Sequence, residues 1–291
     1  MINMVYVVMG PTCSGKTALA NYLMDKLHCD AINFDAFQIY KDMDIGTAKL
    51  EKNDPHYARY HLLDIVSPEQ TFSVKEYQDV CRKELDTILK KDKDVVMVGG
   101  TGLYVRAALY DYVFNEEEVP VDEDLLDLSN DELYSMLQKL DLKASEKIHV
   151  NNRKRLLRAI SLIRHAGKKK SEIIDEQKHE PIYKDVRFIY LAPDRNVLYD
   201  NINKRVRLMV ENGLVDEVKY LLNKYDLSYT ARQGIGYKET IDYLDGSISL
   251  EECIDLIAKR TRNYAKRQVT FFKHQFNSES YSSLEEAIKH L

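Results

Sequence analysis

The eight residues GPTCSGKT near the N-terminus have the spacing of a phosphate-binding loop, G-x-x-x-x-G-K-[ST]. In such a loop, backbone N–H groups and the start of the following helix hold phosphate oxygens. Lys16 adds a positive charge, and the hydroxyl of Thr17 is suited to bind Mg²⁺. The predicted phosphate-binding residues are Gly10, Pro11, Thr12, Cys13, Ser14, Gly15, Lys16 and Thr17, and Thr17 is also the predicted metal ligand.

An acidic residue and a glycine-rich turn follow two other apolar segments. Asp35 comes directly after AINF, and Gly99-Gly100-Thr101 follow VVMV. P-loop proteins that hydrolyse nucleotides usually carry an acid at the end of a neighbouring strand, where it helps to hold Mg²⁺. Asp35 could serve as that ligand or as a proton acceptor. These residue types leave two functions open: phosphoryl transfer by a small-molecule or nucleoside kinase, and a group transfer that releases diphosphate.

Four short apolar segments are predicted to be the strands that position these groups. They are Val5–Met9, Ala31–Phe34, Val95–Val98 and Val186–Ala192, and a helix is expected from about Gly15 to Leu27. Continuous apolar strands separated by helical stretches favour a parallel sheet covered on both faces, which binds ligands at the carboxyl ends of its strands. We therefore expect an α/β fold, a P-loop-containing parallel sheet flanked by helices, in which Asp35 and Thr101 approach the phosphate loop.

The rest of the chain is predicted to be mostly helical. Residues 112–181 contain no apolar strand and are typical of a helical insertion, placed within a catalytic core made of residues 1–111 and 182–291. The C-terminal part is predicted to be helical throughout. Its expected helices are Arg195–Glu211, Val215–Asn223, a segment around Gln233–Leu244, and two that begin at the capping boxes Ser249–Glu252 and Ser283–Glu286.

The composition is that of an ordinary globular chain. Its 291 residues, 44% of them hydrophobic, can form one large domain with an insertion. No apolar run reaches the ~20 residues of a membrane span. Four scattered cysteines without a C-x-x-C pair favour reduced thiols. We therefore expect a cytoplasmic protein that acts as a monomer without a membrane partner.

The net charge of −5 hides an uneven distribution. Residues 116–132 hold nine Asp or Glu and no Lys or Arg, whereas residues 153–170 hold eight Lys or Arg and no acid. Residues 259–273 hold six more basic residues, again without an acid. Two basic clusters in an acidic protein suggest a local footprint for a polyanion, with an ordinary solvated surface as the alternative.

Five further segments resemble those of the tRNA dimethylallyltransferase family, in its bacterial form. They are DAFQIYKDMDIGTAK, YHLLDIVSP, VGGTGLY, QGIGYKE and TRNYAKRQVTFFK, and they occur in the family's order across almost the whole chain. Some residues depart from the family pattern. Ala36 stands where the family usually has serine, and TFFK replaces the usual T-W-F-R.

The resemblance implies that the P-loop holds dimethylallyl diphosphate instead of ATP. The acceptor would be N6 of the adenosine at tRNA position 37, next to the anticodon, and pyrophosphate would leave. Because the lone pair of N6 is delocalised into the adenine ring, attack benefits from a base, and Asp35 is the predicted base. Thr101 is expected at the acceptor nucleotide, and Arg267 at the diphosphate. The predicted catalytic residues are thus Asp35, Thr101 and Arg267.

Contacts with the anticodon stem-loop of tRNA are predicted at polar and basic side chains. Arg262 and Lys266 lie on a different helical flank from Arg267 and are assigned to RNA. Glutamine amides are suited to reading base edges, and basic residues of the insertion to binding phosphates. The predicted tRNA-contacting residues are Asp35, Ala36, Phe37, Gln38, Thr101, Lys154, Arg155, Arg158, Gln233, Lys238, Arg262, Lys266 and Gln268.

Overall fold

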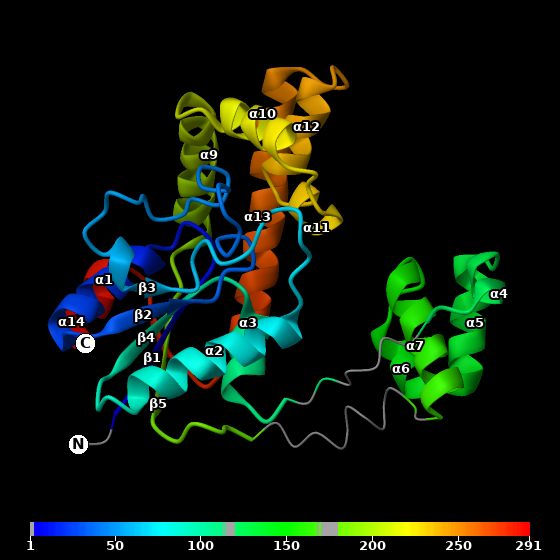
Figure 1. Cartoon of the computed structure of the whole chain (residues 1–291), viewed down its shortest axis with the longest axis horizontal. Helices are drawn as coiled ribbons and strands as arrows, with labels where there is room; N and C mark the ends of the chain where they lie inside the picture. The colour runs from blue at the N-terminus through cyan, green and yellow to red at the C-terminus, as the bar shows by residue number, and fades with distance from the viewer. Residues whose placement is uncertain (1–2, 113, 115–119, 168, 170–179) are drawn as a thin grey trace. The chain divides into compact units, whose positions relative to one another are not determined.

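The computed structural model describes residues 3–112, 114, 120–167, 169 and 180–291. The chain divides into two compact units (Figure 1). Met1–Leu109 and Tyr183–Leu291 together form the first unit, here called the core, and Tyr110–Ile182 form the second, here called the insertion. Parts of the acidic run and of the first basic run noted above, residues 116–119, 168 and 170, lie outside the described residues.

A parallel sheet forms the centre of the core. Its six strands in the described part of the chain are β1 (Val5–Met9), β2 (Asp30–Asn33), β3 (Tyr60–His61), β4 (Val95–Gly99), β5 (Val186–Leu191) and β6 (Glu279–Tyr281). They lie in the order β3-β2-β4-β1-β5-β6, and each neighbouring pair is parallel. The predicted α/β fold is confirmed. The sequence patterns predicted β1, β2, β4 and β5 but neither of the edge strands β3 and β6.

The strand register brings three chain ends to the same edge of the sheet. Met9 of β1 lies opposite Gly99 of β4, and Asn33 of β2 lies opposite Val98 of β4. The segments that follow β1, β2 and β4 therefore leave the sheet side by side. These segments are the phosphate loop, the segment beginning at Phe34-Asp35, and the glycine-rich turn.

Helices cover the sheet because their apolar faces need burial. One buried cluster joins Leu19 and Leu23 of α1 (Lys16–Leu27) to Val96 and Ile189 of the sheet, and it also includes Ala287 of α14 (Leu284–His290). The helices α2 (Val74–Leu89) and α3 (Gly102–Leu109) pack on each other, and α2 also contacts β2 and β4. The predicted parallel sheet is thus flanked by helices, as Figure 1 shows.

A second core forms among the C-terminal helices. They are α9 (Arg195–Glu211), α10 (Leu214–Lys224), α11 (Tyr229–Arg232), α12 (Tyr237–Leu244) and α13 (Leu250–Gln275). The predicted capping box at Ser249 and Glu252 forms and starts α13. Ser283 caps α14, but the Glu286 carboxylate accepts from the backbone of Ser282 instead of Ser283. No helix in the described part of the chain has both the length and the apolar character needed to cross a bilayer.

The insertion is a small helical unit with its own apolar core. Its helices are α4 (Glu123–Leu126), α5 (Asn130–Leu140), α6 (Leu142–Lys147) and α7 (Arg153–Ala166). Leu125, Leu133 and Leu156 are fully buried in its core. Its two ends are joined, because Tyr110 forms a bridge with Pro181 and the N–H of Asp111 donates to the Glu180 carbonyl at 2.9 Å.

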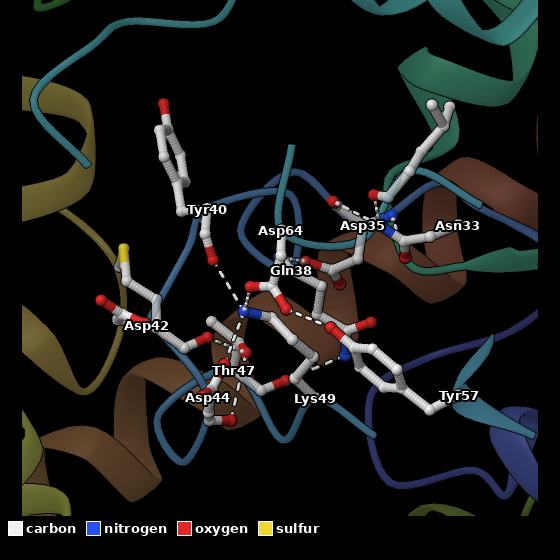
Figure 2. A network of polar contacts seen from close by, with 12 residues as sticks. Asn33, Asp35, Gln38, Tyr40, Asp42, Asp44, Thr47, Lys49, Tyr57 and Asp64 are labelled. Atoms are coloured by element: carbon white, nitrogen blue, oxygen red, sulfur yellow. Dashed lines mark hydrogen bonds and ion pairs between the residues drawn. The ribbon is translucent and has the colours of Figure 1, made fainter. Parts of the chain in front are cut away.

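The segment between β2 and β3 is held by polar contacts around a buried lysine (Figure 2). The Lys49 ammonium donates to the Tyr40 carbonyl, to Asp44 and to Asp64, each at 2.7 Å. The hydroxyl of Tyr57 also donates to the Asp64 carboxylate. Lys49 is only 7% exposed, and a buried cation is tolerated when carboxylates and carbonyls surround it. The lysine therefore fixes a long segment that has little regular structure.

Candidate active site

The phosphate loop runs from the end of β1 into α1 in a conformation that needs its glycines. A Cβ on Gly10 would lie 2.7 Å from the Leu191 carbonyl, and Gly15 has φ +91° at the start of the helix. The hydroxyl of Ser14 is buried without a hydrogen-bond partner among the described residues. A buried unpaired hydroxyl beside a helix N-terminus fits a site for phosphate oxygens, which would satisfy it.

Lys16 is the cation of this loop. Its ammonium donates to the Pro11 carbonyl at 2.7 Å. Burial lowers the pKa of Lys16 to about 8; the Asp35 carboxylate opposes that shift and Arg205 adds to it. Burial therefore disfavours the charged form of Lys16, and a bound anion would stabilise it. This is the behaviour expected of a lysine that binds phosphate.

Close packing of two strand ends places Asp35 next to Thr101. A Cβ on Gly99 would lie 2.5 Å from the carbonyl carbon of Phe34, so only glycine fits there. Beyond this point the Thr101 N–H donates to the Phe34 carbonyl at 3.3 Å, and the Ala36 N–H donates to the Thr101 hydroxyl at 3.1 Å. The turn after β4 and the segment after β2 are thus tied together.

One oxygen of the Asp35 carboxylate is held by the backbone. Oδ1 accepts from the N–H groups of Phe37 at 2.9 Å and Gln38 at 3.4 Å, a local turn that fixes the side chain (Figure 2). Oδ2 lies on the side of Gly100, 3.6 Å from where a Cβ on that glycine would stand. Asp35 also lines the cavity above the phosphate loop. The fixed carboxylate can therefore present Oδ2 to a bound molecule.

Two cavities meet at Asp35. The first, of about 300 Å³, is polar, and the phosphate loop, Arg205 and Gln268 line it. The second, of about 150 Å³, is mostly apolar, and its walls include Phe37, Ile202, Met209, Ile235 and Ile257. Six residues line both cavities: Thr12, Asp35, Thr47, Ala48, Arg205 and Tyr264. The arrangement offers a polar site for phosphates and an adjoining apolar site, with a carboxylate at their boundary.

Arg205 lines both cavities, whereas the predicted Arg267 lines neither. Arg267 is exposed and does not line either cavity, and its guanidinium lies over the Tyr264 ring at 5.7 Å from the centroid. Arg205 comes from α9, where it sits one position before buried Val206 and three after buried Ile202. Its place at the border of an apolar helical face is visible in the sequence, but that pattern alone does not show that this border meets the phosphate loop.

Gln268, a predicted tRNA contact, bridges two loops through its side-chain amide. Its Oε1 accepts from the Thr12 N–H at 2.9 Å, and its Nε2 donates to the Gly100 carbonyl at 2.8 Å. The side chain is 5% exposed, and a Cβ on Gly100 would lie 2.4 Å from Nε2. Gln268 therefore joins the phosphate loop to the turn that carries Thr101.

Tyr264 is a further site residue that the sequence analysis missed. It lies on α13 four residues before Gln268, so both side chains project from the same helical face. Burial raises the pKa of Tyr264 to about 12, and the Asp35 carboxylate contributes to the rise. The phenol therefore keeps its proton at neutral pH and can donate a hydrogen bond beside Asp35.

The other predicted tRNA contacts fall in three places. Gln38 lines the polar cavity and donates to the carbonyls of Thr47 at 3.1 Å and Ala48 at 3.3 Å. On the C-terminal helices, Gln233 and Lys266 are exposed, Lys238 is partly exposed, and Arg262 donates to Asn203 at 2.5 Å. On the insertion, Lys154, Arg155 and Arg158 are all exposed on α7.

Other basic residues near these positions are used for internal contacts. Arg153 donates to the carbonyls of Leu126 and Leu128, and Arg164 pairs with Asp122 and Asp124. In the core, Arg260 pairs with Glu239, whose side chain is buried. Local charge counts in the sequence therefore overstate the number of cations available to a partner.

Comparison with known proteins identifies the family. A family model described as IPP transferase matches residues 38–275. A tRNA dimethylallyltransferase of Acetivibrio thermocellus is 40% identical, covering 99% of this chain and 96% of the relative. Its counterpart of the same name in Bacillus subtilis is 39% identical, covering 93% of this chain and 88% of the relative.

Solved structures give the same result. The tRNA delta(2)-isopentenylpyrophosphate transferase of Staphylococcus epidermidis superposes with a TM-score of 0.73 at 34% identity, covering 99% of this chain and 97% of that one. A eukaryotic dimethylallyltransferase acting on tRNA superposes with a TM-score of 0.83 at 27% identity, covering 99% of this chain and 77% of that one. The chain therefore belongs to the IPP transferase family, whose relatives named above are tRNA dimethylallyltransferases.

Proposed function

We propose that this chain transfers a dimethylallyl group from dimethylallyl diphosphate to N6 of the adenosine at tRNA position 37, and that pyrophosphate leaves. The observation that carries the proposal is the meeting of a polar and an apolar cavity at Asp35. A prenyl diphosphate has a charged diphosphate that suits the polar cavity and a hydrocarbon chain that suits the apolar one. A kinase acting on small molecules or nucleosides would also use the phosphate loop, but membership of the IPP transferase family favours prenyl transfer.

The donor's diphosphate is assigned to the polar cavity. The N–H groups of the loop and the Ser14 hydroxyl face the phosphate oxygens, and Lys16 and Arg205 neutralise the charge that grows as the allylic C–O bond breaks. Mg²⁺ commonly binds one or two protein oxygens together with substrate phosphates, and the Thr17 hydroxyl at the helix start suits that role. Bound there, the ion would supply further positive charge to the leaving diphosphate.

Asp35 is assigned to the proton of the acceptor. N6 attacks the allylic carbon as the C–O bond breaks, the bonding electrons leave with the diphosphate, and Asp35 Oδ2 takes the N6 proton. The backbone bonds to Oδ1 hold the carboxylate in place for this transfer. The Thr101 hydroxyl, which the Ala36 N–H fixes, and the Tyr264 phenol lie beside it as donors to the adenine or to the carboxylate.

The tRNA is assigned to exposed basic and polar side chains. A base stacked in an anticodon loop must leave the stack to reach the partly buried Asp35 carboxylate, and a single-stranded loop lowers that cost. Phe37 and Gln38 follow Asp35 and face the cavities, so they are placed to contact the extruded nucleotide. Lys154, Arg155 and Arg158 would bind phosphates of the stem, and Arg262, Lys266, Gln233 and Lys238 the loop around it.

One assay tests the proposed function directly. The protein is incubated with labelled dimethylallyl diphosphate and an anticodon stem-loop that carries adenosine next to the anticodon. We expect label in the RNA, release of pyrophosphate and no reaction when that adenosine is replaced by guanosine. Phosphoryl transfer from ATP to a nucleoside, with no label in the RNA, would establish the kinase function instead.

The pKa of Lys16 predicts how use of the donor depends on pH. Below pH 8 the ammonium is charged, and above it the lysine loses its proton, so kcat/KM for the donor should fall as the pH rises through about 8. In the Lys16→Arg variant the charge persists, and this fall should disappear even where the absolute rate is lower. Lys16→Ala should be slow at every pH. The same alkaline fall in Lys16→Arg would assign it to another group.

Asp35→Asn tests the proposed base. The amide keeps the shape of the side chain but cannot accept a proton at neutral pH. We expect single-turnover transfer to fall by about 10²- to 10⁴-fold with both substrates still bound, and extra Mg²⁺ should not restore it.

Asp42→Asn is a matched control for the base. Asp42 lies on the same segment but pairs with Lys224 and Tyr225 outside both cavities, so its variant should react normally. Recovery of Asp35→Asn at high Mg²⁺ would identify Asp35 as a metal ligand, and the base would have to be another group.

Salt dependence tests the exposed basic face of α7. Replacing Lys154, Arg155 and Arg158 by alanine should weaken binding to all anticodon stem-loops alike. The slope of log K against log salt should flatten by about 0.7 to 0.9 for each lost phosphate contact. Replacing exposed Lys83 within α2 together with exposed Lys90 and Lys91 just beyond its end removes equal charge and should leave the slope almost unchanged. Equal slopes in both triple variants would exclude the α7 residues from the RNA site.

A further inference from the structure

A carboxylate from a C-terminal helix holds the segment Asp44–Ala48, here called the cavity loop. Glu217 of α10 accepts from three successive N–H groups: Asp44 at 3.0 Å, Ile45 at 2.6 Å and Gly46 at 3.1 Å. Successive backbone N–H groups that converge on one carboxylate form a strong, charge-assisted contact. The backbone of the cavity loop is therefore shaped around a single side chain from a distant part of the sequence.

Tyr237 completes this contact with its hydroxyl and its ring. Its hydroxyl donates to Glu217 Oε1 at 2.7 Å, and its buried ring lies against Gly46, where a Cβ would come within 2.6 Å of the ring carbons. Burial, together with the Glu217 carboxylate, raises the pKa of Tyr237 well above its usual value, so the phenol remains a donor. Glu217 thus has four donors, two on each oxygen.

The cavity loop connects Glu217 to the apolar cavity and to the turn that holds Asp35. Gly46, Thr47, Ala48 and Tyr237 form one wall of the apolar cavity that Asp35 also lines. The carbonyls of Thr47 and Ala48 accept from Gln38, and the N–H of Gln38 in turn binds Asp35 Oδ1. A displacement of the loop would therefore move the cavity wall and the turn that holds Asp35.

We propose that Glu217 is a positioning residue for prenyl transfer: through the cavity loop and Tyr237 it sets the wall that confines the donor's hydrocarbon chain and the orientation of Asp35. The inference rests on the proposed function of the site. Glu217 touches neither substrate, because it lines neither cavity. Its effect must therefore pass through the loop, which gives it two separable consequences, on rate and on the length of donor chain accepted.

Glu217→Gln is the direct test. The amide offers one acceptor oxygen, and its NH₂ faces N–H donors, so part of the four-donor contact is lost without a change in size. With dimethylallyl diphosphate and the anticodon stem-loop at saturation, we expect the single-turnover rate to fall by about 10- to 100-fold. A rate loss of this size is expected when reacting groups are displaced by about 1 Å. The affinity for the stem-loop should not change.

Chain-length selectivity separates positioning from a general loss of stability. The kcat/KM ratio for the five-carbon donor over the ten-carbon geranyl diphosphate should fall by about tenfold in Glu217→Gln, because a loosened wall no longer excludes the longer chain. A variant that is merely less stable would lose activity on both donors equally. Asp216→Asn, on the neighbouring exposed residue of α10, is the matched control and should change neither rate nor ratio.

Tyr237→Phe keeps the ring against Gly46 and removes one hydrogen bond, so it tests the inference if Glu217→Gln folds poorly. The rate and the selectivity ratio should shift in the same direction as in Glu217→Gln by about 3- to 10-fold, as expected for the loss of one ordinary hydrogen bond. The double variant should be no worse than Glu217→Gln, because both act on one contact.

The outcomes distinguish the two proposals. If the unmodified protein does not transfer the dimethylallyl group, the proposed function fails. If it does, and both variants keep the parental rate and ratio, or if their effects add independently, Glu217 has no positioning role.

Discussion

The absence of space for a side chain at Gly99 is the constraint on which the site depends. At this point β2 and β4 approach so closely that a Cβ would overlap the Phe34 backbone. The approach lets the chain segments beyond the strands exchange hydrogen bonds, and these place Asp35 beside Thr101. Since β4 also pairs with β1, the same register delivers the phosphate loop to the same edge. The phosphate loop and the Asp35 carboxylate thereby come to line the same cavity.

Local patterns in the sequence were enough for the elements that carry the phosphate site. β1, α1 and α13 have apolar periodicity or caps that depend only on neighbouring residues, and their predictions are confirmed. β3 and β6 are two and three residues long at the sheet edges. These edge strands form because the neighbouring strand pairs with them, and their own sequences contain no run of apolar residues that would predict a strand.

The residues that helices distant in the sequence contribute to the site could not be predicted in the same way. Arg205, Tyr264 and Gln268 reach the site from α9 and α13, and a helical wheel gives the face of a residue but not what that face will meet. The wheel separated Arg267 from Arg262 but gave no reason to prefer Arg205. The block DAFQIYKDMDIGTAK was identified by resemblance alone, and its contacts now give a physical account: Asp35, Gln38 and Lys49 hold one another's segments through backbone carbonyls and N–H groups.

Because the two ends of the insertion are joined, its length can change during evolution with little effect on the core. Tyr110 and Pro181 pair, and Asp111 binds Glu180, so the insertion begins and ends at one place. A module whose entry and exit coincide can gain or lose residues while the strands before and after it keep their spacing. Insertions and deletions between these positions would thus leave the contacts within the core intact, whereas a change of one residue between β2 and Lys49 would displace the contacts that hold Asp35.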